Sequence, residues 1–259
     1  MLKPLASHTA GVCAAALGIT LGASAPSALA AEPVGQRFSV GVEVGAVGFA
    51  RNDVRIPGEG GTRFDMTDVV GAGPEPFVRV DGRWRITERQ ELRVMLAPLE
   101  VTASGELDQP TQFAGETFAA GATDGTYRFN AYKFTWRYAL ADRGRLSWGI
   151  GFTGLIRDAK IALRQGDTRA SDDNLGFVPA LHLSGDYRLG ERWSLGLDLD
   201  GLAGGPGRLL DASVTLDYAA SPHWRIGGGY RTLEGGADTD DVYNFAWLNY
   251  ALLEVRYLR

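Results

Sequence analysis

The chain has 259 residues, 45% of them hydrophobic and 22% charged, with a formal net charge of −5 and a single cysteine, Cys13. Nucleic-acid binders carry clustered positive charge, so this acidic chain is not expected to be one. One cysteine excludes an internal disulfide and a zinc–cysteine site, and the length fits one large β domain or two small ones.

The N-terminus predicts an export signal. Lys3 precedes an apolar run over residues 11–21, and Ala28-Leu29-Ala30 forms a small-residue cleavage site. The run is too short to cross a bilayer as a helix, and no later stretch approaches ~18 apolar residues, so no transmembrane helix is expected. Residues 1–30 are therefore predicted to be a signal peptide, and residues 31–259 a single domain of 229 residues (259 − 30) without cysteine.

From Arg37 onward, apolar and polar residues alternate with a period of two, which is typical of strands that have one apolar face. In the stretch RWSLGLDLDG, for example, Leu195 and Leu197 alternate with Gly196 and Asp198. The pattern predicts about ten strands, and eight to twelve are compatible with it. Their approximate ranges are 38–50, 76–86, 91–104, 127–140, 146–162, 177–189, 193–203, 209–220, 224–234 and 243–258.

The connections between these strands fall into two classes that alternate along the chain. Four are short, at 87–90, 141–145, 190–192 and 221–223. The others are mostly longer, at about 51–75, 105–126, 163–176, 204–208 and 235–242. An up-and-down sheet with this order has short turns at one end and longer loops at the other, as outer-membrane barrels do.

Tryptophan and tyrosine gather on the apolar faces beside the short turns, as in the aromatic girdle of a membrane interface. The predicted girdle consists of Trp84, Trp136, Tyr138, Trp148, Tyr187, Trp193, Tyr218, Trp224 and Tyr257. A looser set near the opposite ends includes Tyr132, Phe177, Tyr230, Phe245 and Trp247.

The predicted fold is all-β, a closed antiparallel up-and-down transmembrane β-barrel whose apolar face meets lipid. Backbone groups in lipid must all be bonded internally, so such a sheet has to close. The alternative is a soluble periplasmic barrel or sandwich with the apolar face inside. That alternative explains the alternation, but not the two classes of connection and the aromatic placement together.

In these three features the chain resembles the small Gram-negative outer-membrane β-barrel proteins, the OmpA-like and OmpW-like group. The resemblance covers the whole predicted domain and rests on pattern rather than on a motif. It implies residence in the outer membrane after export, contact with outer-membrane lipid and lipopolysaccharide, and insertion by the barrel assembly machinery. No cofactor, metal or nucleic acid is expected, and the ligand is unknown.

The polar faces carry many charges of both signs. Ten strands lie near the size at which a barrel is filled by its own side chains, so the first expectation is a stabilising ion-pair network in a mostly filled lumen. The alternative is a narrow pore for small solutes. The predicted network consists of Glu43, Arg79, Asp81, Arg83, Arg85, Arg137, Asp198, Asp200, Asp217, Arg225, Arg231, Glu254 and Arg256, with Arg93, Lys133, Asp186 and Arg188 on the same faces.

His182, Ser184 and Asp186 share one face of a predicted strand. The His-x-Ser pair resembles that of the outer-membrane lipid A deacylases, which implies a third hypothesis, a lipid A-modifying hydrolase. A serine nucleophile needs its base within hydrogen-bond reach, whereas same-face neighbours lie roughly 6.5–7 Å apart along a strand. The expected role is therefore a polar lumen histidine rather than a catalytic one.

Two predicted loops carry apolar residues. Segment 62–76 contains Met66, Val69 and Val70 and is expected to form a short helix or a lid over the barrel mouth. The segment around Phe113 and Phe118 is expected to extend a hairpin above the membrane. The acidic segments 166–174 and 235–242 are expected to be solvated loop tips.

Overall fold

The computed structural model describes residues 36–205 and 207–259, so the predicted signal peptide, residues 1–30, lies outside the described residues. The strands are β1 (Phe38–Arg55), β2 (Phe64–Asp65), β3 (Glu75–Arg85), β4 (Gln90–Ala97), β5 (Glu100–Leu107), β6 (Thr111–Phe113), β7 (Glu116–Phe118), β8 (Gly121–Arg143), β9 (Leu146–Gln165), β10 (Thr168–Arg188), β11 (Trp193–Gly204), β12 (Gly207–Ala219), β13 (Trp224–Asp238) and β14 (Tyr243–Leu258), and helix α1 is Thr67–Val70.

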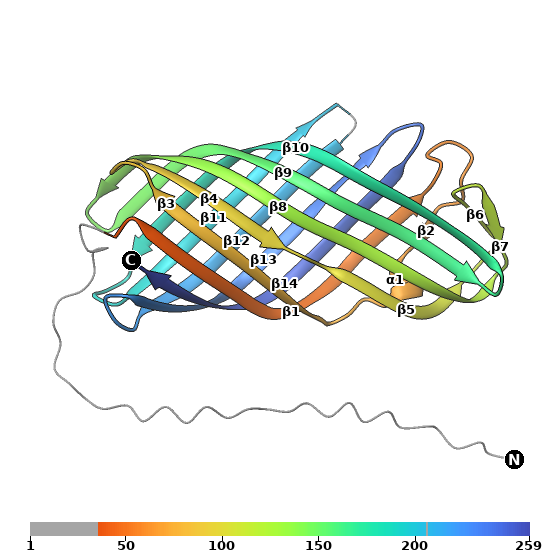
Figure 1. Ribbon diagram of the computed structural model, residues 1–259, viewed down its shortest axis with the longest axis horizontal. Helices are drawn as coiled ribbons and strands as arrows, with labels where there is room; N and C mark the ends of the chain where they lie inside the picture. Colours follow the sequence, from red (N-terminus) through yellow and green to blue (C-terminus); the bar gives the residue numbers. More distant parts are fainter. Residues whose placement is uncertain (1–35, 206) are drawn as a thin grey trace, which may run out of the picture.

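Twelve strands form one antiparallel sheet that closes on itself, because β1 pairs with β14 from Ser39↔Leu258 to Arg55↔Tyr243. β2 is a two-residue extension, and β4 and β5 share one position against β8, so the barrel has ten strand positions (12 − 2). Figure 1 shows the tilted strands from the side. The predicted closed antiparallel barrel of about ten strands is confirmed.

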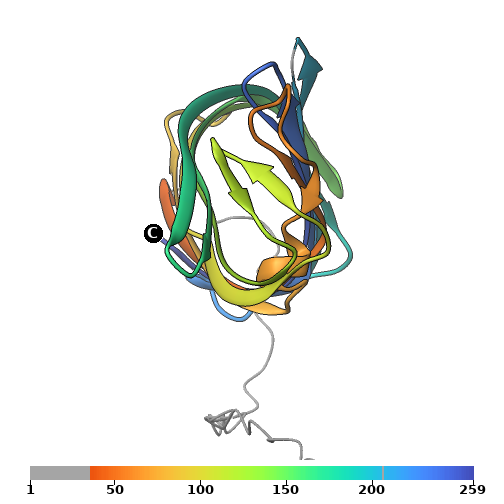
Figure 2. The ribbon, with the colours of Figure 1, turned by 90° about the vertical axis from the view of Figure 1, so that its right-hand side faces the viewer.

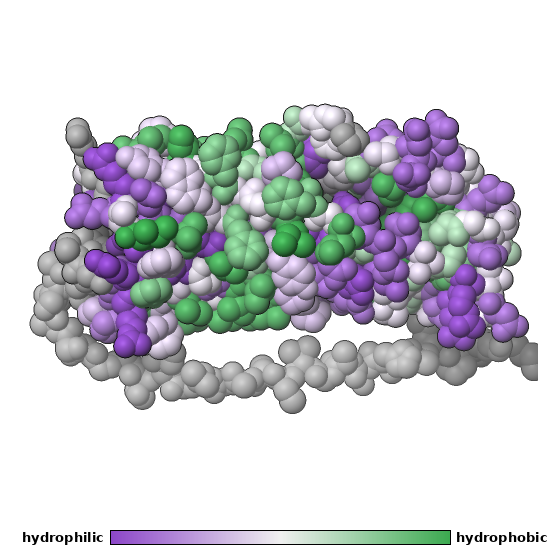
Figure 3. Space-filling model, turned by 45° about the horizontal axis from the view of Figure 1, so that its top comes forward, coloured by the Kyte–Doolittle hydropathy of each residue, from purple (hydrophilic) through white to green (hydrophobic). Residues whose placement is uncertain are grey.

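Side chains alternate between the two faces of the wall. In β14, Leu253 is 64% exposed on the outside, whereas its neighbour Leu252 is 4% exposed on the inside. The same alternation runs through β1, β3, β4 and β11. Figure 3 shows the outer face, with an apolar band between more polar ends. The apolar band of a transmembrane barrel faces lipid, and the polar row faces the lumen.

Among the described residues, no helix is long and apolar enough to cross a membrane.

The predicted aromatic girdle lies at the end of the barrel that holds the short turns and the C-terminus, which we call the turn end. Its members contact one another across strands: the ring centroids of Trp193 and Tyr218 are 4.9 Å apart, and those of Trp224 and Tyr257 are 5.0 Å apart. Phe38, which was not predicted, stacks on Trp84 at 6.0 Å. The seven exposed members of the girdle are Trp84, Trp136, Trp148, Tyr187, Trp193, Trp224 and Tyr257. Tyr138 and Tyr218 are half-buried.

The opposite end, the hairpin end, differs from the sequence prediction. Residues 163–176, expected to be a loop, belong mostly to β9 and β10, which join through a tight turn at Gly166 and Asp167. Gly166 has φ +60°, which glycine adopts without strain in a two-residue hairpin turn. β11, β12 and β13 also extend beyond their predicted ranges at this end, whereas β14 has the predicted bounds. The chain therefore projects at this end as strands rather than as loops.

The predicted strand 91–104 is wrong as a single element. It is interrupted at Pro98 and Leu99, where β4 ends and β5 begins. Proline has no N–H to donate to a ladder, so it ends regular pairing there. β4 pairs with β3 on its free side, whereas β5 pairs with β8 alone. The gap beside β5 is where α1 packs, with more contact to β5 than to any other strand.

Leu197 tests which face meets lipid. It lies exposed on β11 between Gly185 of β10 and Val214 of β12. Leu197→Arg should lower the free energy of unfolding by about 2–4 kcal/mol for a position near the bilayer midplane, because the guanidinium must leave water for lipid. Urea titration of the protein folded in lipid vesicles measures this loss. Leu197→Ala is the control, and equal losses for the two variants would contradict a lipid-facing position.

Candidate functional site: the barrel interior

The interior has three layers between the hairpin end and the turn end. An apolar plug fills the hairpin end, a layer of buried ion pairs crosses the middle, and a polar cavity opens toward the turn end. Each layer is built from the inward face of the wall, and the plug adds two segments from the connections. The layers decide whether solutes can pass and whether any reactive group is accessible.

The plug consists of α1 and the β6–β7 hairpin. Met66, Val69 and Val70 are buried, as the predicted lid requires, and Phe113 and Phe118 are fully buried. Figure 2, along the barrel, shows the hairpin folded inside the ring of strands. The hairpin was expected to extend outward. It turns inward because its two phenylalanines gain more from burial among apolar side chains than from exposure to water.

Backbone contacts hold the plug in place. The amide of Met66 donates to the carbonyl of Asn52 at 2.8 Å, and the amide of Ala114 donates to the carbonyl of Ile56 at 2.9 Å. Helix α1 lies so close to β5 that a Cβ at Gly105 would be 2.2 Å from the carbonyl oxygen of Asp68. Glycine is thus required for this close approach. The plug is a fixed part of the barrel rather than a loose loop.

The middle layer is centred on Lys133, which is 2% exposed. Its Nζ donates to Asp200 at 2.8 Å and also to Asp211. Arg231 donates to both oxygens of Asp211, from Nε and Nη2, each at 2.6 Å. Buried charges are tolerated where opposite charges and hydrogen bonds satisfy them. These ion pairs cross the lumen and occupy the space that water would fill in an open channel.

Asp198 and Asp200 join a second set of partners. Arg93 donates to both oxygens of Asp198, at 2.6 and 3.0 Å. His182 Nδ1 lies 2.8 Å from Asp200 Oδ1, and the hydroxyl of Thr153 donates to the same oxygen at 2.7 Å. Every carboxylate in this set therefore already has a cationic or hydroxyl partner.

The structure does not assemble the catalytic candidates into a working triad. His182 pairs with Asp200, which comes from β11, and not with Asp186 of its own strand. Ser184 accepts a hydrogen bond from Arg137 Nη1 at 3.3 Å. Both His182 and Ser184 are 4% exposed and face the lumen. A serine bonded to a guanidinium lacks the adjacent base that activates a nucleophile.

His182, Asp198 and Asp200 place three possible metal-ligand atoms within 4.8 Å of one another. The two carboxylates already bind Arg93 and Lys133. A divalent cation there would have to displace or repel these side chains. The donor set therefore fits an internal ion-pair network and not a metal centre.

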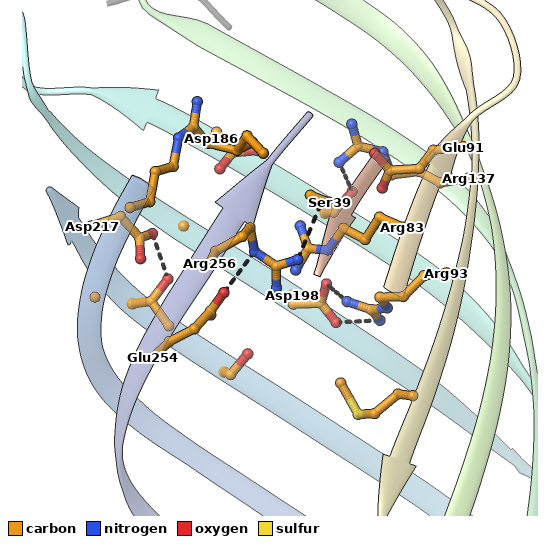
Figure 4. Close-up of a pocket in the computed structure, with 18 of the residues that line it drawn as sticks. Ser39, Arg83, Glu91, Arg93, Arg137, Asp186, Asp198, Asp217, Glu254 and Arg256 are labelled. Carbon is orange, nitrogen blue, oxygen red and sulfur yellow. Dashed lines mark hydrogen bonds and ion pairs between the residues drawn. The ribbon is translucent and has the colours of Figure 1, made fainter. Parts of the chain in front are cut away.

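Toward the turn end lies a polar cavity of about 100 Å³, lined by charges from most of the wall. Figure 4 shows Arg83, Arg137 and Arg256 among these side chains. Arg256 donates to both oxygens of Asp81, at 3.0 and 2.7 Å. Arg93 and Asp198 form the inner boundary of the cavity, where the middle layer begins.

Most of the remaining predicted lumen residues also lie in the interior. Arg79 lies 3.5 Å from Glu43, and its guanidinium lies 4.0 Å from the ring centroid of Tyr250. The residues that line the cavity include Glu43, Arg85, Asp186, Asp217, Arg225 and Glu254. Arg188 lies elsewhere, since it donates to the backbone carbonyl of Gly144 in the turn between β8 and β9.

Asp211 is the central acid that the sequence prediction omitted. It belongs to the same face of β12 as Asp217, which the predicted network already includes. The period-two pattern alone would therefore have found it. Its pairing with Lys133, 78 residues away, had no local signal.

Comparison of the sequence with protein-family models and with curated proteins finds no match. The fold is similar to the outer membrane protease OmpT from Escherichia coli, with a TM-score of 0.52, 10% identity, and coverage of 86% of this chain and 97% of that one. Weaker similarity extends to Ail of Yersinia pestis (TM-score 0.37, 9% identity, 86% and 99% covered) and to Neisserial surface protein A (0.36, 12%, 85% and 96%). At these identities the likeness shows the fold alone, that of the small Gram-negative outer-membrane β-barrels.

Lys133 and Lys160 form a matched pair for measuring the middle layer. Lys133→Met keeps the length of the side chain but leaves Asp200 and Asp211 short of a buried partner, so we expect a loss of about 3–5 kcal/mol. Lys160 is 31% exposed at its side chain and lies 3.4 Å from the half-exposed Asp173. Lys160→Met should cost less than about 1 kcal/mol. Urea unfolding in lipid vesicles compares the two, and similar losses would contradict a central role for Lys133.

Proposed function

We propose that this protein is a non-enzymatic outer-membrane β-barrel that does not conduct solutes and acts through the surface at its hairpin end. In this proposal the turn end faces the periplasm and the hairpin end faces the outside, the orientation that the short turns favour. Export by a signal peptide at residues 1–30 and insertion by the barrel assembly machinery belong to the same proposal.

The observation that carries the proposal is the layered interior. A solute entering from the turn end would meet the bidentate Arg93–Asp198 pair and then Lys133 with its two acids. Beyond these lie the buried side chains of α1 and the β6–β7 hairpin. Passage would require both the ion pairs and the plug to move.

The hairpin end supplies the surface available for binding. β8, β9 and β10 have 23, 20 and 21 residues, whereas about 9–11 suffice for a tilted strand to cross a bilayer. The excess length forms a wall of strands that projects at the hairpin end (Figure 1). A protein with a filled lumen and a projecting wall is suited to binding or shielding at the cell surface.

Two alternatives remain as candidates of other classes. The narrow pore draws on the polar cavity toward the turn end, which is lined by charged side chains such as Arg83, Asp186 and Arg256. The lipid A-modifying hydrolase draws on the His182 and Ser184 pair, both of which face the lumen rather than lipid. If the protein were a lipid A hydrolase with Ser184 as its nucleophile, Ser184→Ala would change the lipid A species that mass spectrometry detects in cells. We expect the same lipid A species in the wild type and in this variant.

Conductance separates the closed barrel from the pore. In planar bilayers the wild-type protein should give no discrete current steps, because the middle layer and the plug block the lumen. Current steps that change in Asp198→Asn but not in the outward-facing control Leu195→Ala would show ions passing through the lumen. That result would overturn the closed-barrel proposal in favour of the solute pore.

A further inference from the structure

An arginine patch lies on the outside of the barrel, just above the apolar band at the hairpin end. Arg51 and Arg55 come from β1, Arg208 comes from β12, and Arg63 precedes β2. Strands β1, β14, β13 and β12 are consecutive neighbours in the wall. The four guanidiniums therefore share one sector of the outer surface, which we call the arginine patch.

Two carboxylates, Asp53 and Glu234, form ion pairs with arginines of the patch. Asp53 pairs with Arg51 at 3.4 Å and with Arg63 at 2.8 Å. Glu234 pairs with Arg51 at 3.6 Å and with Arg208 at 2.7 Å. Two carboxylates thus face four guanidiniums.

Two further acids lie beside the patch. Asp65 is the cross-strand partner of Asp53, and its carboxylate accepts hydrogen bonds from the backbone amides of Asn52 and Thr67 at 3.1 and 2.9 Å. Asp238 is exposed and is the cross-strand partner of Tyr243. Among the described residues, neither acid is paired with an arginine of the patch at ion-pair distance, so the case for an anion rests on the position of the guanidiniums rather than on a net charge.

Aromatic rings hold the arginines against the wall. The guanidiniums of Arg55 and Arg63 lie 5.2 and 4.9 Å from the ring centroid of Tyr243. That of Arg208 lies 4.6 Å from the ring of Phe245. Phe245, expected in the second aromatic set, is thereby 9% exposed. These cation–π contacts hold the guanidiniums over the rings of Tyr243 and Phe245.

The height of the patch relates it to the lipid surface. Leu210 and Tyr230 are exposed on the outer face on the membrane side of the patch, and Trp247 is exposed beside its cross-strand partner Arg51. Arg208 lies two residues beyond Leu210, a rise of roughly 6.6 Å along the strand, or about 5 Å of depth at a tilt of about 40°. The patch therefore lies where hydrocarbon gives way to lipid headgroups.

We infer that the arginine patch binds the phosphate groups of a phosphorylated lipid of the outer leaflet, the phosphorylated glucosamine headgroup of lipopolysaccharide. Guanidiniums bind phosphate in bidentate geometry. The arginine side chains lie against aromatic rings at the height of the lipid headgroups, so they can contact a lipid phosphate in the positions that they already occupy. The inference rests on the proposed location and orientation in the membrane, but not on the closed lumen.

The test uses lipid A carrying two phosphates, and dephosphorylated lipid A, titrated into the detergent-solubilised full chain and followed by native mass spectrometry. The wild type should bind the phosphorylated form more tightly. Arg63→Gln with Arg208→Gln should weaken that binding by roughly 25-fold, since each arginine near an anionic lipid surface contributes about fivefold. The single variants should each lose about fivefold, which keeps the test usable if the double variant folds poorly.

Arg164→Gln with Arg169→Gln is the matched control. These two arginines are exposed and paired across β9 and β10 near their turn, on the other wall, and their removal changes the net charge equally. Affinity of this control should stay within about twofold of the wild type, because it leaves every guanidinium of the patch in place. An equal loss in both double variants, or no loss in either, would overturn the inference.

Inorganic phosphate separates the lipid from a free anion. Competition by millimolar phosphate that abolishes lipid A binding would assign the patch to a soluble anion and overturn the lipid assignment. None of these outcomes depends on conductance. A conducting barrel that binds lipid A would contradict only the closed-barrel proposal, and a closed barrel that does not bind lipid A would contradict only the arginine-patch inference.

Discussion

The pairing of Lys133 with Asp200 and Asp211 is the interaction on which the interior depends. A ten-strand wall encloses a space that its own inward side chains have to fill, and here many of those side chains are charged. Lys133 comes from β8, Asp200 from β11 and Asp211 from β12, so one ammonium group ties distant parts of the wall together. His182 also pairs with Asp200, and Arg231 also pairs with Asp211.

This layer also explains the different character of the two ends. On the hairpin side the lumen is apolar, and α1 and the β6–β7 hairpin fold inward to cover it. On the turn side the inward faces stay polar, and the space that remains is the cavity beneath Arg93 and Asp198. His182 and Ser184 instead take part in hydrogen bonds within the lumen, His182 with Asp200 and Ser184 with Arg137.

Much of this architecture could be read from the sequence, because a half-buried strand repeats every two residues. The alternation predicted which face of β11 carries Leu197 and which carries Asp198, and the apolar residues of segment 62–76 predicted a short helix or a lid at the barrel mouth. The turn at Gly166 and Asp167 was missed because the polar residues around it read as a loop, although a Gly-Asp pair is a hairpin signal.

The contacts across the lumen could not be predicted in the same way. Arg93 and Asp198 are 105 residues apart, and they meet only when the barrel radius and the strand stagger are known. A sequence pattern gives the face of each residue but not its height in the barrel. The arginine patch has the same origin, since Arg63 and Arg208 join one surface only after β1 closes on β14.

Spin labels along one strand test the central claim, that the apolar face meets lipid and the charged face is enclosed. With Cys13 replaced by serine, single cysteines at residues 195–200 of β11 can be labelled in the vesicle-bound protein. The account predicts high collision rates with oxygen dissolved in lipid at 195, 197 and 199, and low rates at 196, 198 and 200. Collisions with a water-soluble paramagnet at 195, 197 and 199 would contradict it, because the apolar face would then not be covered by lipid.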